Sequence, residues 1–178
     1  MRPNAILMVG IAFGIDPGKQ QIGDILVAKR LFCYEPLRAG TLPDGTKVTI
    51  SRGDRATAST RLLNYCEDGE LSWATGQSEV RFGLVLSGEK LLDHAPAVAE
   101  LRAHAPEAIG GEMEGAGLYV AATHHTIDWV LIKAICDWAD GHKGEDKTAR
   151  QALAARNAAS FALHVVARGG FAPEARGV

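Results

Sequence analysis

WVLIKAICDWAD, from Trp129 to Asp140, contains the clearest structural signal in the chain. Residues 129–135 read as a continuous apolar strand, which is typical of a strand buried on both faces of a parallel sheet. Asp137 lies just past this strand, at the end where open α/β sheets bind their ligands. The stretch therefore predicts a buried strand followed by a candidate functional carboxylate.

Patterns of strand and helix alternate along the rest of the chain. Strands are predicted over 6–9, followed by a glycine loop, and over 22–32, 47–51 and 80–87; helices are predicted over 55–66, 96–105, 112–125 and 148–168. This alternation predicts an α/β domain over 1–170, with a mainly parallel or mixed twisted sheet flanked by helices, and a loose tail over 171–178. Gly115 and Gly117 fall inside one predicted helix, where each costs about 1 kcal/mol relative to Ala, and so indicate close packing or a ligand at the backbone.

Composition narrows the class of protein. The 178 residues fit one domain, and 47% hydrophobic with 22% charged residues is typical of a soluble globular chain, not of a disordered, fibrous or membrane-spanning one. A net charge of -2 offers no attraction to nucleic acid or anionic lipid, so we expect neither as a partner. The three cysteines form no C-x-x-C pair, which excludes a recognisable thiolate metal site and favours a reducing cytoplasm. We expect no metal and no cofactor.

Carboxylates are concentrated in two otherwise apolar stretches, GGEMEG over 110–115 and ICDWAD over 135–140. On a helix, Glu112 and Glu114 would point to different sides, so that one can serve a ligand and the other the backbone. Both can equally be caps, because a carboxylate at a helix N-terminus accepts its exposed N–H groups. Asp137 is open to the same alternative.

Five motifs in this order resemble the purine nucleoside phosphorylase superfamily. They are VGIAFG over 9–14, IGDILV over 22–27, LSGE over 86–89, GEMEG over 111–115 and ICDWAD over 135–140. The likeness extends over residues 5–165 and is greatest to the nucleosidase branch, which includes methylthioadenosine/S-adenosylhomocysteine nucleosidases and related anti-phage effector domains. It implies an N-ribosyl hydrolase that acts on an adenine nucleoside, thio-nucleoside or nucleotide, and a homo-oligomer.

The resemblance also implies roles for individual residues. Glu114 corresponds to the carboxylate that hydrogen-bonds the ribose hydroxyls, Met113 to the side chain against the sugar, and Asp137 to the acid that assists departure of the purine. The chemistry agrees, since cleavage of an N-glycosidic bond develops positive charge on the ribose and negative charge on the base. Further substrate-binding residues are expected at Glu112, Leu91, Gly10, Ile11 and Ala12.

Two departures from the family pattern bear on activity. Ile11 stands where relatives commonly hold a hydroxyl for phosphate or water, which favours a hydrolase over a phosphorylase because Ile11 has no donor for phosphate. Family domains also begin with a further strand and glycine turn, which carry an acidic or basic residue for the nucleophile. These elements would precede Met1. The domain is therefore expected to be N-terminally truncated. The alternatives are therefore a nucleosidase, a binding or interaction domain that retains the cleft without catalysis, and a phosphorylase.

Overall fold

A computed structural model describes residues 3–35, 37–41, 43–51, 53–73, 78–89, 95–141 and 146–169. In chain order its elements are β1 (Ala5–Gly14), β2 (Ile25–Cys33), β3 (Leu37–Thr41), β4 (Lys47–Ser51), β5 (Arg55–Thr57), α1 (Thr60–Leu71), β6 (Val80–Ser87), α2 (Ala95–His104), β7 (Ala108–Glu112), α3 (Gly115–His125), β8 (Asp128–Asp137) and α4 (Lys147–Ala167). This arrangement confirms the α/β class. The predicted tail over 171–178 lies outside the described residues.

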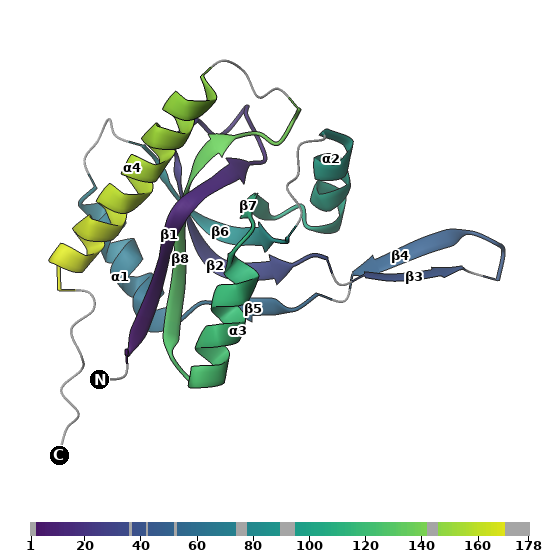
Figure 1. The fold of residues 1–178 in the computed structure, drawn as a ribbon, viewed down its shortest axis with the longest axis horizontal. Coiled ribbons are helices and arrows are strands. Elements are labelled where there is room, and N and C mark those ends of the chain that lie inside the picture. Colours follow the sequence, from purple (N-terminus) through teal and green to yellow (C-terminus); the bar gives the residue numbers. More distant parts are fainter. Residues whose placement is uncertain are drawn as a thin grey trace.

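The main sheet is mixed and runs in the order β5-β2-β6-β7-β1-β8, with an additional pairing of β2 with β8. Strands β2, β6 and β7 are mutually parallel, and so are β1 and β8, but β1 is antiparallel to β7 and β8 is antiparallel to β2. The extra β2–β8 pairing joins the edge strand β8 to β2, near the other end of the strand order. A second sheet, the β3–β4 hairpin, projects away from this body (Figure 1).

Helices cover both sides of the sheet, with α1 and α4 on one side and α2 and α3 on the other (Figure 1). The principal core lies between these layers and contains fully buried side chains from β2, α1, β8 and α4, among them Leu31, Leu62, Ile132 and Phe161. Each contributes about 1.5–3 kcal/mol through burial. Among the residues that the structure describes, no helix has the length and apolar character needed to cross a membrane.

Strand β8 is buried along almost its whole length, which confirms the strand predicted from its apolar run. β6 matches the predicted span of 80–87. β1 is longer than predicted, because residues 10–14 continue the strand instead of forming a glycine loop. β2 begins at Ile25, since residues 22–23 form a turn in which Gly23 has a φ of 94°.

The helix predicted over 55–66 is wrong at its start. Arg55–Thr57 forms β5, which pairs antiparallel with residues 30–32 of β2, and α1 begins only at Thr60. The Arg55 guanidinium stacks over the Phe32 ring at 4.7 Å and pairs with Glu107 at 2.6 Å. These tertiary contacts outweigh the local helical pattern.

The helix predicted over 112–125 also begins too early, and strand β7 before it went unpredicted. Glu112 is the last residue of β7, and α3 begins at Gly115. Glycines hide this strand because they lower its apparent β-propensity. Glycine is nonetheless required at these positions, because a Cβ at Gly111 would collide with the Phe13 ring and a Cβ at Gly110 with Leu26.

Candidate functional site

The N-terminus of α3 is capped by side chains from two neighbouring strands. The Glu112 carboxylate accepts the N–H groups of Glu114 and Gly115 at 2.9–3.0 Å, and Ser87 Oγ accepts the N–H of Ala116 at 2.8 Å. Gly115 is needed here, because its Cβ would lie 2.7 Å from Glu112 Oε1. The capping interpretation is therefore confirmed for Glu112, although the residue caps from a strand end and not from within the helix.

Lys133 connects the two glutamates of the GEMEG motif. This lysine is only 3% exposed, and its Nζ lies 2.6 Å from Glu114 Oε2 and 3.3 Å from Glu112 Oε2. The side chain of Glu112 is fully buried, whereas that of Glu114 is 59% exposed. Glu114 therefore presents an ion-paired carboxylate to solvent at the first turn of α3.

Opposing effects act on the pKa of Glu114. Partial burial raises this pKa, but the hydrogen bond and charge of Lys133, together with hydrogen bonds from Glu112 and the Met113 backbone, lower it below the ordinary value for a glutamate. The net direction agrees with the geometry, since an ammonium lies within hydrogen-bond distance of the carboxylate. Glu114 is therefore ionised at neutral pH.

Asp137 is the last residue of β8, and its carboxylate bonds to the residue before it and to the turn that follows. Its Oδ1 accepts the N–H of Ala139 at 2.9 Å, and its Oδ2 accepts the Cys136 thiol at 3.2 Å. Ala139 adopts a left-handed conformation with a φ of 51°. Burial, reinforced by the Asp137 charge, raises the pKa of Cys136 to about 12, so the thiol remains a donor at neutral pH. Asp137 thus stabilises a turn, while helix α4 begins later, at Lys147.

Strand register places the two acidic motifs at the same level of the sheet. Asp137 of β8 pairs with Phe13 of β1, which pairs in turn with Gly111 of β7. Adjacent strands lie about 4.8 Å apart, so the backbones of Asp137 and Gly111 are separated by about 10 Å. Asp137 ends β8, Glu112 ends β7 and Glu114 follows two residues later, so the segments that hold these carboxylates begin at neighbouring strand ends.

The other predicted substrate-binding residues differ in accessibility. Gly10 pairs with Lys133, and a Cβ built on it would lie 3.0 Å from Lys133 Nζ. Met113 is 39% exposed beside Glu114, whereas Ala12 is buried with Leu26 and Ile135. Ile11 packs partly against the principal core. Leu91 lies outside the described residues.

Sequence reasoning missed Lys133 and the capping role of Ser87. A single cation within the apolar run of β8 is the signal that identifies Lys133, because a buried ammonium must be paired. The residues that it pairs with, at the end of β7 and the start of α3, are distant from β8 in the sequence, so their identity depends on the fold.

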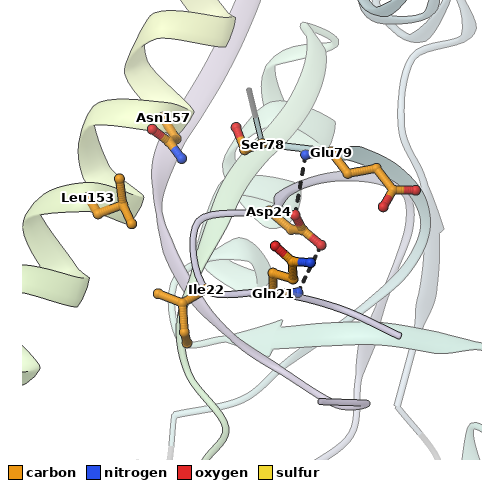
Figure 2. Close-up of a pocket in the computed structure, with 7 residues that line it drawn as sticks. All are labelled: Gln21, Ile22, Asp24, Ser78, Glu79, Leu153 and Asn157. Atoms are coloured by element: carbon orange, nitrogen blue, oxygen red, sulfur yellow. Dashed lines mark hydrogen bonds between the residues drawn. The ribbon is translucent and has the colours of Figure 1, made fainter. Parts of the chain in front are cut away.

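A polar pocket of about 380 Å³ lies on the side of the sheet covered by α4 (Figure 2). It is lined by Gln21, Ile22, Asp24, Ser78, Glu79, Leu153 and Asn157. Asp24 accepts the N–H groups of Gln21 and Glu79 and pairs with Arg81 at 2.9 Å. These bonds make Asp24 a residue that fixes the start of β2, and none of the predicted site residues lines this pocket.

The fold and the site together define an α/β domain with a carboxylate–lysine–carboxylate cluster and an acidic turn at its strand ends. Residues 1–167 match the sequence profile of the phosphorylase superfamily, and the chain belongs to that family. It is 29% identical to a death domain-containing ATP nucleosidase of Amphimedon queenslandica, with 92% of this chain aligned to 33% of that protein. It is 24% identical to a 5'-methylthioadenosine/S-adenosylhomocysteine nucleosidase of Haemophilus influenzae, with coverage of 94% and 70%.

Solved structures share the fold. The 5'-methylthioadenosine/S-adenosylhomocysteine nucleosidase of Neisseria meningitidis, in complex with methylthio-immucillin-A, superposes with a TM-score of 0.75 at 21% identity, over 92% of this chain and 69% of that one. Futalosine hydrolase of Helicobacter pylori superposes with a TM-score of 0.73 at 20% identity, over 93% and 68%. The chain thus spans about a third of the first curated relative and about two thirds of these structures.

Proposed function

We propose that this domain is a purine N-ribosyl hydrolase that cleaves the glycosidic bond of an adenine nucleoside, thio-nucleoside or nucleotide. The observation that carries the proposal is the ionised, solvent-facing carboxylate of Glu114, just after strand β7, whose Gly111 lies across β1 from Asp137. The nucleosidases among its relatives support the same chemistry.

Each acid has a distinct task in this proposal. Glu114 accepts hydrogen bonds from the ribose hydroxyls and stabilises the positive charge that develops on the sugar. Met113 packs against the ribose ring. Asp137 donates a proton or hydrogen bond to the departing purine, which carries the negative charge. The exposure of Glu114 and Met113 supports these roles, because both side chains are accessible to a ligand.

Hydrolysis is favoured over phosphorolysis by the charges at the site. Lys133 is shared by two carboxylates, so the cluster of Lys133, Glu112 and Glu114 has a net charge of about -1 and repels a phosphate anion. Ile11 adds no hydroxyl donor. Water, which is neutral, is the nucleophile that we propose.

We further propose a cytoplasmic homo-oligomer. The free thiols of Cys33, Cys66 and Cys136 support a reducing compartment. Strand β1 pairs with β7 only at Phe13 and Gly14, so residues 5–12 have no strand partner on that edge within the described part of the chain. An apolar edge of this length is suited to pairing with a strand of another subunit.

Release of free base tests the function directly. The purified chain is incubated with adenosine, AMP, ATP, methylthioadenosine or S-adenosylhomocysteine, with and without inorganic phosphate, and the products are separated by chromatography. We expect adenine release from at least one substrate at the same rate in both buffers. Release only with phosphate would identify a phosphorylase, whereas binding without release would identify a non-catalytic ligand-binding domain.

A further inference from the structure

We propose that Lys133 is a positioning residue that holds the Glu114 carboxylate in the orientation needed to receive the ribose, and that Gly10 is required opposite it to leave room for the ammonium group. This inference rests on the proposed function. It adds a residue of β8 and one of β1 to the parts of the site that determine how the sugar is bound.

A chain of contacts transmits rigidity from the backbone to Glu114. Glu112 is fixed by two backbone N–H groups at the start of α3. Its carboxylate contacts Lys133 Nζ at 3.3 Å, and the same Nζ donates to Glu114 Oε2 at 2.6 Å. Glu114 itself is 59% exposed, so without this contact its side chain would be free to sample several rotamers.

The burial of Lys133 requires its ammonium group to be paired and restricts where that group can lie. An ammonium that is almost completely removed from water is stable only when it is paired and hydrogen-bonded, and here both partners are carboxylates. Because Lys133 lies on a strand buried along most of its length, its stem has little freedom to move. The position of its Nζ is therefore set by the sheet, and Glu114 follows that position.

Gly10 provides the space that Nζ occupies. The two residues pair across β1 and β8, and an added Cβ would lie 3.0 Å from Nζ and 3.3 Å from Cδ of the lysine. A methyl group there would push the ammonium away by a few tenths of an ångström. The hydrogen bond to Glu114 would then lengthen while the charges remained in place.

The charges that face Glu114 predict how pH should act. Lys133 approaches from β8 and Glu112 from β7, while Cys33 and Tyr34, at the end of β2, lie within the field of Glu112. Glu114 is the group whose pKa is lowered, so it stays ionised until the pH falls below the ordinary glutamate range. Removal of Lys133 leaves two carboxylates close together without the ammonium that favours their charged form, and the pKa of Glu114 then rises.

Steady-state kinetics of three variants test the proposal. In Lys133→Met we expect kcat/KM to fall at least about tenfold at neutral pH and the acid limb of its pH profile to move upward by about one unit or more. Lys133→Arg should restore most of both losses. Gly10→Ala should raise KM while the acid limb moves by less than in Lys133→Met. The matched control is Lys29→Met, which removes a half-exposed lysine of β2 paired with Glu67 at 2.7 Å and should leave the profile unchanged.

A structural role alone would lower the melting temperature of Lys133→Met without moving the acid limb, and that result would overturn the proposal. NMR titration of the Glu114 carboxyl carbon, assigned with Glu114→Gln, provides a readout that needs no turnover. If the wild type releases no base, the proposed function fails, while a higher Glu114 pKa in Lys133→Met still supports the coupling. An unchanged pKa refutes the coupling whatever the activity. Should Lys133→Met fail to fold, the pH profile of kcat/KM and the NMR titration of Glu114 are measured on Lys133→Arg and Gly10→Ala instead.

Discussion

The substitution Asp137→Asn separates the chemistry of this residue from its structural role. Asn retains an oxygen that can accept the Ala139 N–H, so the turn after β8 keeps its principal hydrogen bond. The amide nitrogen that replaces Oδ2 is a donor only and cannot accept a hydrogen bond from the Cys136 thiol, so this weak bond is lost. We therefore expect unfolding free energy to change by only about 0.5–1 kcal/mol.

The rate of base release should change far more in Asp137→Asn than the free energy of unfolding does. A general acid contributes about 10²–10⁴-fold to a rate, equivalent to about 3–5 kcal/mol in the activation barrier. Asn can hydrogen-bond the purine but cannot protonate it, so we expect base release to fall by that factor while nucleoside affinity stays within about tenfold.

The assay pairs chromatography of released base with calorimetric binding and thermal denaturation of the same samples. Asp128→Asn is the control, since Asp128 begins the same strand but pairs with Arg61 at 2.7 Å at the opposite end. Base release by Asp137→Asn at the wild-type rate would refute the acid role. Loss of folding in Asp137→Asn would refute the argument that the turn survives.

Three further predictions concern the site and the assembly. Glu114→Gln should weaken ribose binding and reduce turnover at least tenfold, or about 1.4 kcal/mol, and a wild-type rate would remove Glu114 from the proposal. Gly115→Ala should lower the free energy of unfolding by about 1–3 kcal/mol in denaturant titrations, since its Cβ would meet Glu112 and Leu131; equal stability would contradict the close packing. Light scattering at micromolar protein should give the mass of an oligomer, and Met8→Pro, on the open edge of β1, should reduce it; a monomeric wild type would argue against the edge pairing.

Local sequence patterns were sufficient where an element depends on its own residues. The apolar run of β8 predicted a buried strand because burial on both faces requires apolar side chains at every position. The same approach failed at β7, whose glycines are present for the sake of Phe13 and Leu26 on other strands. It failed again at β5, where pairing with β2 and the contact of Arg55 with Phe32 determine the backbone conformation.

In the candidate site too, the sequence identified individual residues but not the contacts between them. The acidic residues Glu112, Glu114 and Asp137 stood out because they interrupt apolar stretches. Their arrangement did not follow from spacing, because the expectation that Glu112 and Glu114 share a helix was wrong. Lys133 shows the limit most directly: its burial is visible in the sequence, but its partners are the last residue of β7, Glu112, and Glu114, which precedes α3.

The capped end of α3 has a consequence for the kind of ligand that the site accepts. An uncapped helix N-terminus is a favourable place for phosphate, because its free N–H groups and partial positive charge both attract anions. Here the N–H groups of residues 114–116 are already bonded to Glu112 and Ser87, and the Glu112 carboxylate lies at the position where such an anion would bind. The same capping that orders the start of α3 therefore disfavours phosphate there, in agreement with the proposal that the exposed Glu114 binds neutral hydroxyl groups. A site built in this way suits a sugar and a water molecule better than a sugar and a phosphate.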